Sequence, residues 1–532
     1  MAARLPFILI PAIRLLTATA LLATVVGAQH PVSKVRAETL WSLDSVGAAV
    51  ALDGDTAVTF GQLVDNEGNA FVMERTATGW KRTVLLPFVA VAWPWSGLHY
   101  GTNVQIQGDT IFVGATGNDD VGTDAGIVHI HQRDDAGTPC WRLDDTWPEI
   151  GFLLGGDAEV TGHFGYSIAV DGDLVLTGEP GLSGNRGRAY LHRRDDSGTP
   201  GDPFDDVWLR LATLVPPGDP ANSRFGHAVA LCGDLLAVGD PGGDGRVHTY
   251  LRVGDDWVLD ATLMPPGPEP GSFGFSLALQ GGTLLVGHPG HMDWGEALFY
   301  AFDDGGTPTD PADDAWIPDG DLEGDFTYAD FGYAVTLDGD RALISAVTTF
   351  GFFQLGGTVR EAARTPAGWE AVRTFRAADH IQGDRFGAAL DLQGSELLVG
   401  ARGDDDQESG SGAVWFLDLD ADTPWLPEGT GISGGSYVPR LVGWGRLSDN
   451  HDVAMKLYLA WEDDPAWLVV GTTAVFLPFK GGVLVPAPQL VAGPFITDSD
   501  GQVLLEFAWP REVPAGAEIH AQWWLQLSNP LT

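Results

Sequence analysis

The chain has 532 residues, of which 44% are hydrophobic, so it can hold two to four domains and bury a large core. Its 72 acidic residues outnumber 29 basic ones and give a net charge of −43, a field that repels nucleic acid and anionic lipid surfaces. The 71 glycines and 34 prolines predict many short turns and few long helices.

The first 28 residues have the pattern of an export signal. Arg4 and Arg14 supply positive charge, residues 15–26 form a short apolar run, and Val26-Gly27-Ala28 offers small residues for cleavage. Because Arg14 splits the apolar stretch, we expect no spanning helix there, and no later segment is long and apolar enough for one. These features predict a bacterial protein that is secreted, periplasmic or held at the cell surface, without membrane insertion once residues 1–28 are removed.

From residue 47 onward, four markers recur in seven units that begin 48 to 64 residues apart. Each unit has a first glycine, a glycine seven positions later, a glycine before a strand-like run, and a closing tryptophan. In five units another glycine stands thirteen positions after the first. The first glycines are Gly47, Gly101, Gly165, Gly226, Gly274, Gly332 and Gly387.

Each unit predicts four antiparallel strands. In the third unit, SIAV and LVLTG flank Asp171-Gly172-Asp173, where glycine can adopt the positive φ of a tight hairpin. LVL shows no polar alternation, so this strand should be covered on both faces, whereas the fourth strand should be an edge. Seven such units predict an all-β, seven-bladed β-propeller over 37–428. The seventh unit lacks a fourth strand, and we expect residues 37–44 to complete its blade.

Several motifs resemble the FG-GAP repeat family, the propeller of integrin α-subunit heads and of many exported bacterial proteins. They are Phe164-Gly165 with Gly178-Glu179-Pro180, Phe225-Gly226 with Gly239-Asp240-Pro241, Phe273-Gly274 with Gly287-His288-Pro289, and Phe386-Gly387 with Gly400-Ala401. The resemblance implies a propeller that meets ligands on one loop face. Calcium-binding members have a long acidic loop between the first two strands, but this chain has only DGD, QGD or similar turns there. Because Ca²⁺ needs six to eight oxygen ligands, we expect no family calcium site and no cofactor.

Three units carry an acidic expansion between the third strand and the tryptophan. Paired acids there could bind Ca²⁺, but Asp-Gly and Thr-Pro steps favour a solvated turn. The acids are Asp134, Asp135, Asp144, Asp145, Asp195, Asp196, Asp205, Asp206, Asp303, Asp304, Asp313 and Asp314. Cys140 and Cys232 occupy non-equivalent places in different units, so we expect no disulfide.

Connections between second and third strands share one face with the links between blades. On this face, His291, Trp294, Phe352 and Phe353 are the candidate residues of an aromatic binding patch. The alternative is that these rings pack between blades. His288 and His291 as metal ligands would need a third partner that the sequence does not identify, so we predict no metal site.

After a Gly/Ser linker at 429–436, residues 437–532 contain strand-like runs that predict a small C-terminal β-sandwich. We find no sequence motif of a serine-nucleophile elbow, a zinc-protease helix or a phosphate-binding loop. We therefore expect a non-enzymatic recognition or scaffold protein that binds an extracellular or envelope protein or glycan. The alternatives are a propeller-based hydrolase or lyase acting on polysaccharide, and a passive structural component of the envelope or matrix.

Overall fold

The computed structural model describes most of the repeat region and the strands of the two ends. Besides strands named below, it describes residues 43–63, 68–76, 79–86, 100–135, 145–156, 161–199, 202–218, 220–243, 245–267, 272–291, 294–306, 313–324, 330–347, 356–377, 383–404 and 411–420. These residues are almost entirely β-structure, with one helical turn at α1 (Leu182–Asn185) and one at η2 (Pro203–Asp205).

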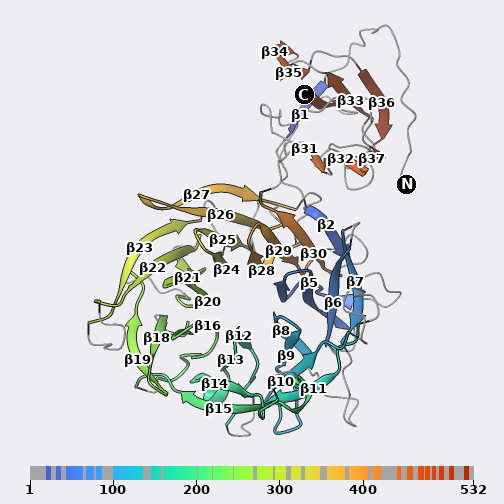
Figure 1. The fold of residues 1–532 in the computed structure, drawn as a ribbon. Helices are drawn as coiled ribbons and strands as arrows, with labels where there is room; N and C mark the ends of the chain where they lie inside the picture. The colour runs from blue at the N-terminus through green and yellow to red at the C-terminus, as the bar shows by residue number, and fades with distance from the viewer. Residues whose placement is uncertain are drawn as a thin grey trace. The chain divides into compact units, whose positions relative to one another are not determined.

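Seven sheets follow one another in chain order around a ring, which confirms the predicted seven-bladed propeller (Figure 1). Blade 1 is β4 (Val50–Asp53), β5 (Thr56–Leu63), β6 (Gly68–Thr76) and β7 (Gly79–Leu85), with β3 (Leu43–Asp44) beside β5. Blade 2 is β8 (Tyr100–Gln107), β9 (Thr110–Ala115), β10 (Ile127–Gln132) and β11 (Glu149–Leu153). Blade 3 is β12 (Ser167–Asp171), β13 (Leu174–Glu179), β14 (Arg188–Asp195) and β15 (Val207–Leu214).

The remaining four blades repeat this arrangement. Blade 4 is β16 (Val229–Cys232), β17 (Leu235–Asp240), β18 (Arg246–Val253) and β19 (Asp256–Leu263). Blade 5 is β20 (Ser276–Gln280), β21 (Thr283–His288), β22 (Glu296–Asp303) and β23 (Ala315–Glu323). Blade 6 is β24 (Phe331–Asp338), β25 (Arg341–Ala346), β26 (Thr358–Thr365) and β27 (Gly368–Phe375). Blade 7 is β28 (Phe386–Gln393), β29 (Glu396–Ala401), β30 (Ala413–Asp418) and β2 (Pro31–Arg36).

Burial within a blade follows the predicted order of strands. The second strand β13 is buried along nearly its whole length, whereas in the fourth strand β15 only Leu214 is buried and the other residues are exposed or partly buried. Inner strands lie between two neighbouring blades, so both of their faces are apolar. The outer strand has an unpaired edge and one solvent-exposed face, which explains why it tolerates charged residues.

The marker glycines stand where the backbones of successive blades touch. A Cβ atom on Gly178 would lie 1.9 Å from the carbonyl oxygen of Gly226, the first glycine of the next blade. Gly226 itself has φ +88°, a conformation that side-chain-bearing residues rarely adopt. Likewise, a Cβ atom on Gly239 would lie 2.1 Å from the Gly274 carbonyl oxygen, and one on Gly400 would lie 1.9 Å from the Gly47 carbonyl oxygen. The repeat therefore preserves glycine because a backbone occupies the space of its side chain.

The short first-to-second-strand hairpins also connect neighbouring blades. In five of the hairpins, the side chain before the turn glycine accepts a hydrogen bond from the turn glycine N–H of the next blade. Asp171 accepts from Gly233 at 2.5 Å, and Gln280 accepts from Gly339 at 2.6 Å. The same bond joins Asp53 to Gly108, Asp338 to Gly394 and Gln393 to Gly54. The acids of the DGD turns therefore have a structural partner in the next blade.

Blade 7 joins blade 1 by the same contacts that join other neighbours. The indole of Trp80 on β7 stacks on the ring of Phe416 on β30, with centroids 4.3 Å apart. Val46 forms a parallel bridge with Gly412, and Gln393 both accepts from Gly54 and donates to Asp53. These contacts close the ring.

The strand that completes blade 7 differs from the predicted one. The outermost strand beside β30 is β2, residues Pro31–Arg36, whereas we expected residues 37–44. Of the expected segment, Leu43–Asp44 forms β3, which pairs with Leu63 and Gln62 of β5 in blade 1, and residues 37–42 lie outside the described residues. The closing strand therefore lies closer to the N-terminus than the sequence predicts.

The described residues of the C-terminal segment form β-strands, and the segment forms a compact unit with the N-terminal residues. One sheet has the order β36 (Leu490–Ile496), β33 (Pro465–Gly471), β38 (His520–Gln526), β1 (Ala20–Val25), β31 (Arg440–Trp444), β32 (Asp452–Tyr458) and β37 (Val503–Ala508). A second sheet pairs β34 (Ala474–Phe479) with β35 (Gly482–Pro486). The finer expectation of a β-sandwich stays a prediction.

The described residues at the N-terminal end include part of the predicted signal peptide. Strand β1 falls within the predicted signal peptide and pairs with β38 and β31. The predicted cleavage site at Val26-Gly27-Ala28 and the linker 429–436 lie outside the described residues. Within the described part of the chain, no helix has the length and apolar character needed to cross a membrane.

Candidate functional site

The β21–β22 connection of blade 5 brings together three of the side chains considered from the sequence. His288 is the last residue of β21, and Glu296 is the first residue of β22, directly opposite it in the strand pair. His291 lies in the connection, where its carbonyl oxygen accepts hydrogen bonds from Trp294 N (3.1 Å) and Gly295 N (2.8 Å). Gly295 has φ +82°, and a Cβ there would lie 2.2 Å from the Phe331 carbonyl oxygen. The turn is therefore fixed against blade 6.

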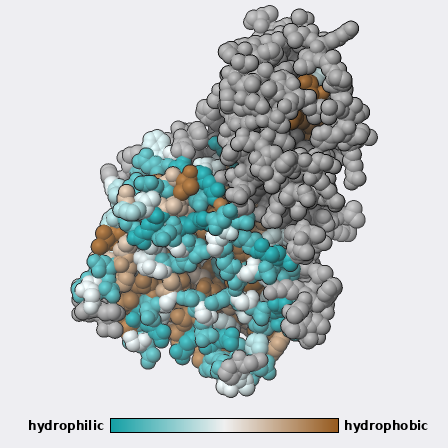
Figure 2. Space-filling model, turned by 45° about the horizontal axis from the view of Figure 1, so that its top comes forward, coloured by the Kyte–Doolittle hydropathy of each residue, from teal (hydrophilic) through white to brown (hydrophobic). Residues whose placement is uncertain are grey.

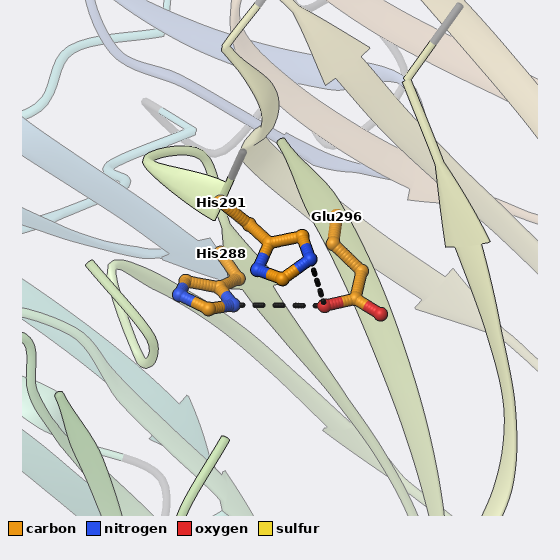
Figure 3. Close-up of side chains that lie close together, drawn as sticks. All are labelled: His288, His291 and Glu296. Atoms are coloured by element: carbon orange, nitrogen blue, oxygen red, sulfur yellow. Dashed lines mark ion pairs between the residues drawn. The ribbon is translucent and has the colours of Figure 1, made fainter. Parts of the chain in front are cut away.

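The two imidazoles and the carboxylate converge on one point (Figure 3). Glu296 Oε2 lies 3.6 Å from His288 Nδ1 and 3.9 Å from His291 Nε2. The two imidazole rings have centroids 5.0 Å apart, and His288 packs edge-on against Phe273. All three residues are buried, with exposed fractions of 1%, 8% and 6% for His288, His291 and Glu296. We call these three residues the blade 5 triad.

Hydrogen bonding in the blade 5 triad is incomplete. Both ring nitrogens of His288, Nδ1 of His291 and Oε2 of Glu296 are buried without a hydrogen-bond partner. A neutral imidazole always carries one N–H, so at least one buried donor of His288 is unsatisfied in either tautomer. Such a group typically costs about 1–3 kcal/mol. The blade 5 triad thus contains buried polar atoms that a bound ligand would satisfy.

The four residues of the predicted aromatic patch have different environments. His291 is buried against Glu296, whereas Trp294 is partly exposed. Phe352 and Phe353 lie outside the described residues. A binding patch made of these four residues therefore stays a prediction. Glu296 is the third partner of the histidines that the sequence did not reveal.

A row of aromatic rings that sequence reasoning missed lies at the start of the innermost strands. Tyr166 stands next to β12, His227 just before β16, Phe275 next to β20, and Tyr333 within β24. Neighbouring ring centroids are 5.0, 4.6 and 5.3 Å apart along this series. We call these four residues the aromatic arc. Each directly follows the first glycine of its unit, which is the signal that could have revealed it.

Strand register places the aromatic arc on the face where the loops lie. Ser167, which opens β12, pairs with Gly178 near the end of β13, and Gly178 pairs with Ala189 at the start of β14. First strands thus begin at the same end of the blade as the connections from second to third strands. We call this end the loop face.

Hydrogen bonds fix the orientation of the arc's imidazole. His227 Nδ1 lies 3.1 Å from the Phe275 carbonyl oxygen, which can only accept, so Nδ1 carries the proton. Nε2 is then free to accept from the Tyr166 hydroxyl at 3.3 Å. Burial lowers the pKa of His227 to about 4, so the ring is neutral at physiological pH. The arc therefore presents uncharged rings.

In the third unit, the described acids of the expansion form hydrogen bonds and an ion pair within or beside their own turn. Asp195 and Asp196 accept from the backbone N–H groups of Ser197 and Gly198, both at 3.0 Å. Arg194 Nε lies 3.0 Å from Asp206. Asp144 and Cys140 lie outside the described residues, and Cys232 is a free cysteine.

Comparisons with known proteins agree with the repeat. The model of the FG-GAP repeat family matches residues 369–416. No curated protein sequence matches the chain.

Among solved structures, similar chains include Sqt1 from Saccharomyces cerevisiae, at 10% identity and TM-score 0.42, covering 74% of this chain and 99% of that one. A chain of a mitotic checkpoint complex has 12% identity and TM-score 0.44, with coverage of 79% and 99%. A putative 6-phosphogluconolactonase from Bacteroides uniformis has 11% identity and TM-score 0.42, with coverage of 62% and 85%.

Proposed function

We propose that this seven-bladed propeller, which carries an FG-GAP repeat, is an exported recognition or scaffold protein without catalytic activity. It binds an extracellular or envelope protein or glycan through its loop face. The observation that carries the proposal is the aromatic arc. FG-GAP propellers are typical of extracellular proteins, which supports the proposed location outside the cytoplasm.

The aromatic arc has the physical properties of a binding surface. Tyr166 is 40% exposed, and His227, Phe275 and Tyr333 are partly exposed. Flat rings held on a rigid sheet offer contact area at little entropic cost and stack on sugar faces or on apolar side chains. The neutral state of His227 favours stacking over proton transfer.

The propeller face drawn in Figure 2 is mainly polar. Figure 2 shows mostly hydrophilic residues on the visible propeller face, with hydrophobic residues in separate smaller areas. With a net charge of −43, the chain repels polyanions at long range. We therefore expect the partner to be a neutral or basic polymer or protein that meets the rings at short range.

The test is capture by the immobilised full chain from a panel of neutral, acidic and basic soluble polysaccharides and from extracts of envelope proteins. We expect Tyr166→Ala and Phe275→Ala each to weaken binding about tenfold, about 1.4 kcal/mol, because a few central residues, often aromatic, carry most of the energy of an interface. Phe152→Ala is the matched control, since this ring is 55% exposed on the outer strand β11.

Equal binding by all three variants would show that the arc does not form the interface. Cleavage of a captured polysaccharide, detected by size-exclusion chromatography, would contradict the non-enzymatic part of the proposal.

A further inference from the structure

We propose that the blade 5 triad, His288, His291 and Glu296, binds one Zn²⁺ ion. This site is independent of the proposed partner binding, because it lies in one blade and needs no contact with the aromatic arc.

The spacing of the three ligands suits a single small ion. One ligand atom from each residue lies within 4.8 Å of the other two. Around a tetrahedral Zn²⁺ with bonds of about 2.0–2.1 Å, ligand atoms are separated by roughly 3.4 Å. The separations of 3.6 Å and 3.9 Å from Glu296 Oε2 exceed this value by a few tenths of an ångström, and the imidazole nitrogens, which lie within 4.8 Å of each other, would close around the ion as well.

The unsatisfied atoms of the triad point to a missing ligand. An ion pair between a protonated histidine and Glu296 would shorten to hydrogen-bond distance, about 2.7–2.9 Å, if geometry allowed. Both separations are longer than this, and both nitrogens of His288 have no hydrogen-bond partner. A metal ion between the three atoms would provide a bond to each of them. This accounts for two buried imidazoles beside a buried carboxylate better than the ion pair does.

Corresponding positions in blades 3 and 4 contain no such triad. In blade 3, the place of His288 is taken by Glu179, which accepts a 2.6 Å hydrogen bond from the Tyr190 hydroxyl. In blade 4, it is taken by Asp240, which lies 3.5 Å from His248 Nε2. His248 Nδ1 bonds to the Thr262 hydroxyl. Among the described residues, three potential metal ligands come this close only in blade 5.

The donor set selects the kind of ion. Two imidazole nitrogens and one carboxylate oxygen suit zinc and its neighbours, whereas Ca²⁺ and Mg²⁺ prefer oxygen ligands alone. Three protein ligands leave one position of a tetrahedral ion for water. Bound Zn²⁺ would tie the connection carrying His291 to the ends of β21 and β22.

The test is zinc uptake by the full chain after treatment with a chelator. We expect one equivalent of Zn²⁺ per chain by mass spectrometry of the dialysed protein, and a rise in the unfolding temperature on zinc addition. His291→Ala and Glu296→Gln should weaken uptake by at least about 100-fold, because even the loss of an outer partner of a zinc ligand typically costs 10–100-fold. Cobalt substitution should give the visible absorption of a tetrahedral site in the wild type alone.

The matched control is His248→Gln, which changes a buried histidine beside an acid in blade 4 and should leave uptake unchanged. Because His291 lies in the connection between β21 and β22, we expect the His291→Ala variant to fold. Circular dichroism will check the folding of each variant. No saturable uptake at one ion per chain would overturn the proposal. Uptake that is equal in the wild type, His291→Ala and Glu296→Gln would overturn it as well, because the ion would then lie elsewhere.

Discussion

Replacing Gly178 by alanine tests how neighbouring blades are held together. The new Cβ would lie 1.9 Å from the Gly226 carbonyl oxygen and 2.3 Å from Ser167 Oγ. Ordinary contacts at a Cβ are 3.4 Å or longer, so the two backbones must separate by more than 1 Å. Overpacking of a core costs about 1–3 kcal/mol when side chains can yield. Here the obstacle is backbone, so we expect a loss of about 3 kcal/mol or more in the free energy of unfolding.

The assay is denaturant unfolding followed by tryptophan fluorescence, because the blade tryptophans report on contacts between blades. Gly172→Ala is the matched control in the same blade. Gly172 has φ +58° and no atom within 4 Å of the built Cβ, so only the backbone penalty of about 1–2 kcal/mol applies. If Gly178→Ala cost no more than Gly172→Ala, the steric explanation of the marker glycine would be refuted.

Two further predictions concern the contact between blades 7 and 1. Gln393→Ala removes the acceptor for Gly54 N–H and the donor to Asp53, so we expect a loss of about 1 kcal/mol in the free energy of unfolding. An unchanged midpoint of denaturant unfolding would contradict the role of these bonds. Burial raises the pKa of Asp391 to about 7, above its unfolded value near 4, so the stability contributed by its protonated form is lost as the pH rises through 7. Because Asp391 keeps some exposure, we expect a loss of about 1–2 kcal/mol between pH 5 and pH 8, which Asp391→Asn should abolish. The same pH dependence in both proteins would show that another group is responsible.

The repeat could be predicted because its markers follow from backbone geometry. Gly178 and its equivalents permit the approach of the next blade, and Trp80 stacks on the preceding blade in the ring. The glycine recurs in five of the seven units and the closing tryptophan in all seven, so both requirements are visible in one sequence. The buried second strands also carry a clear signal, because both faces are covered.

The closing strand was misplaced because an outer strand makes few demands on sequence. Strand β15 shows the typical case, with exposed and partly buried residues of several kinds. Many short segments satisfy such a pattern, and residues 37–44 resembled it. The pairing of β2 with β30 depends on the geometry of the whole ring, which no local motif encodes.

The candidate sites were found only in part for a similar reason. His288 and His291 are close in sequence, but Glu296 joins them because strand register sets it opposite His288. The aromatic arc uses Tyr166, His227 and two further rings, so the residue type changes from unit to unit. Its members become neighbours only when successive blades are placed side by side.

The central claim, that the loop face meets the partner through the aromatic arc, can be tested by photo-crosslinking. A benzophenone amino acid would replace Tyr166 in one full-length protein and Phe152 in another, and each would be irradiated with the captured partner. We expect a covalent adduct from position 166 and none from position 152. An adduct from position 152 alone would place the interface on the outer strands and contradict the claim.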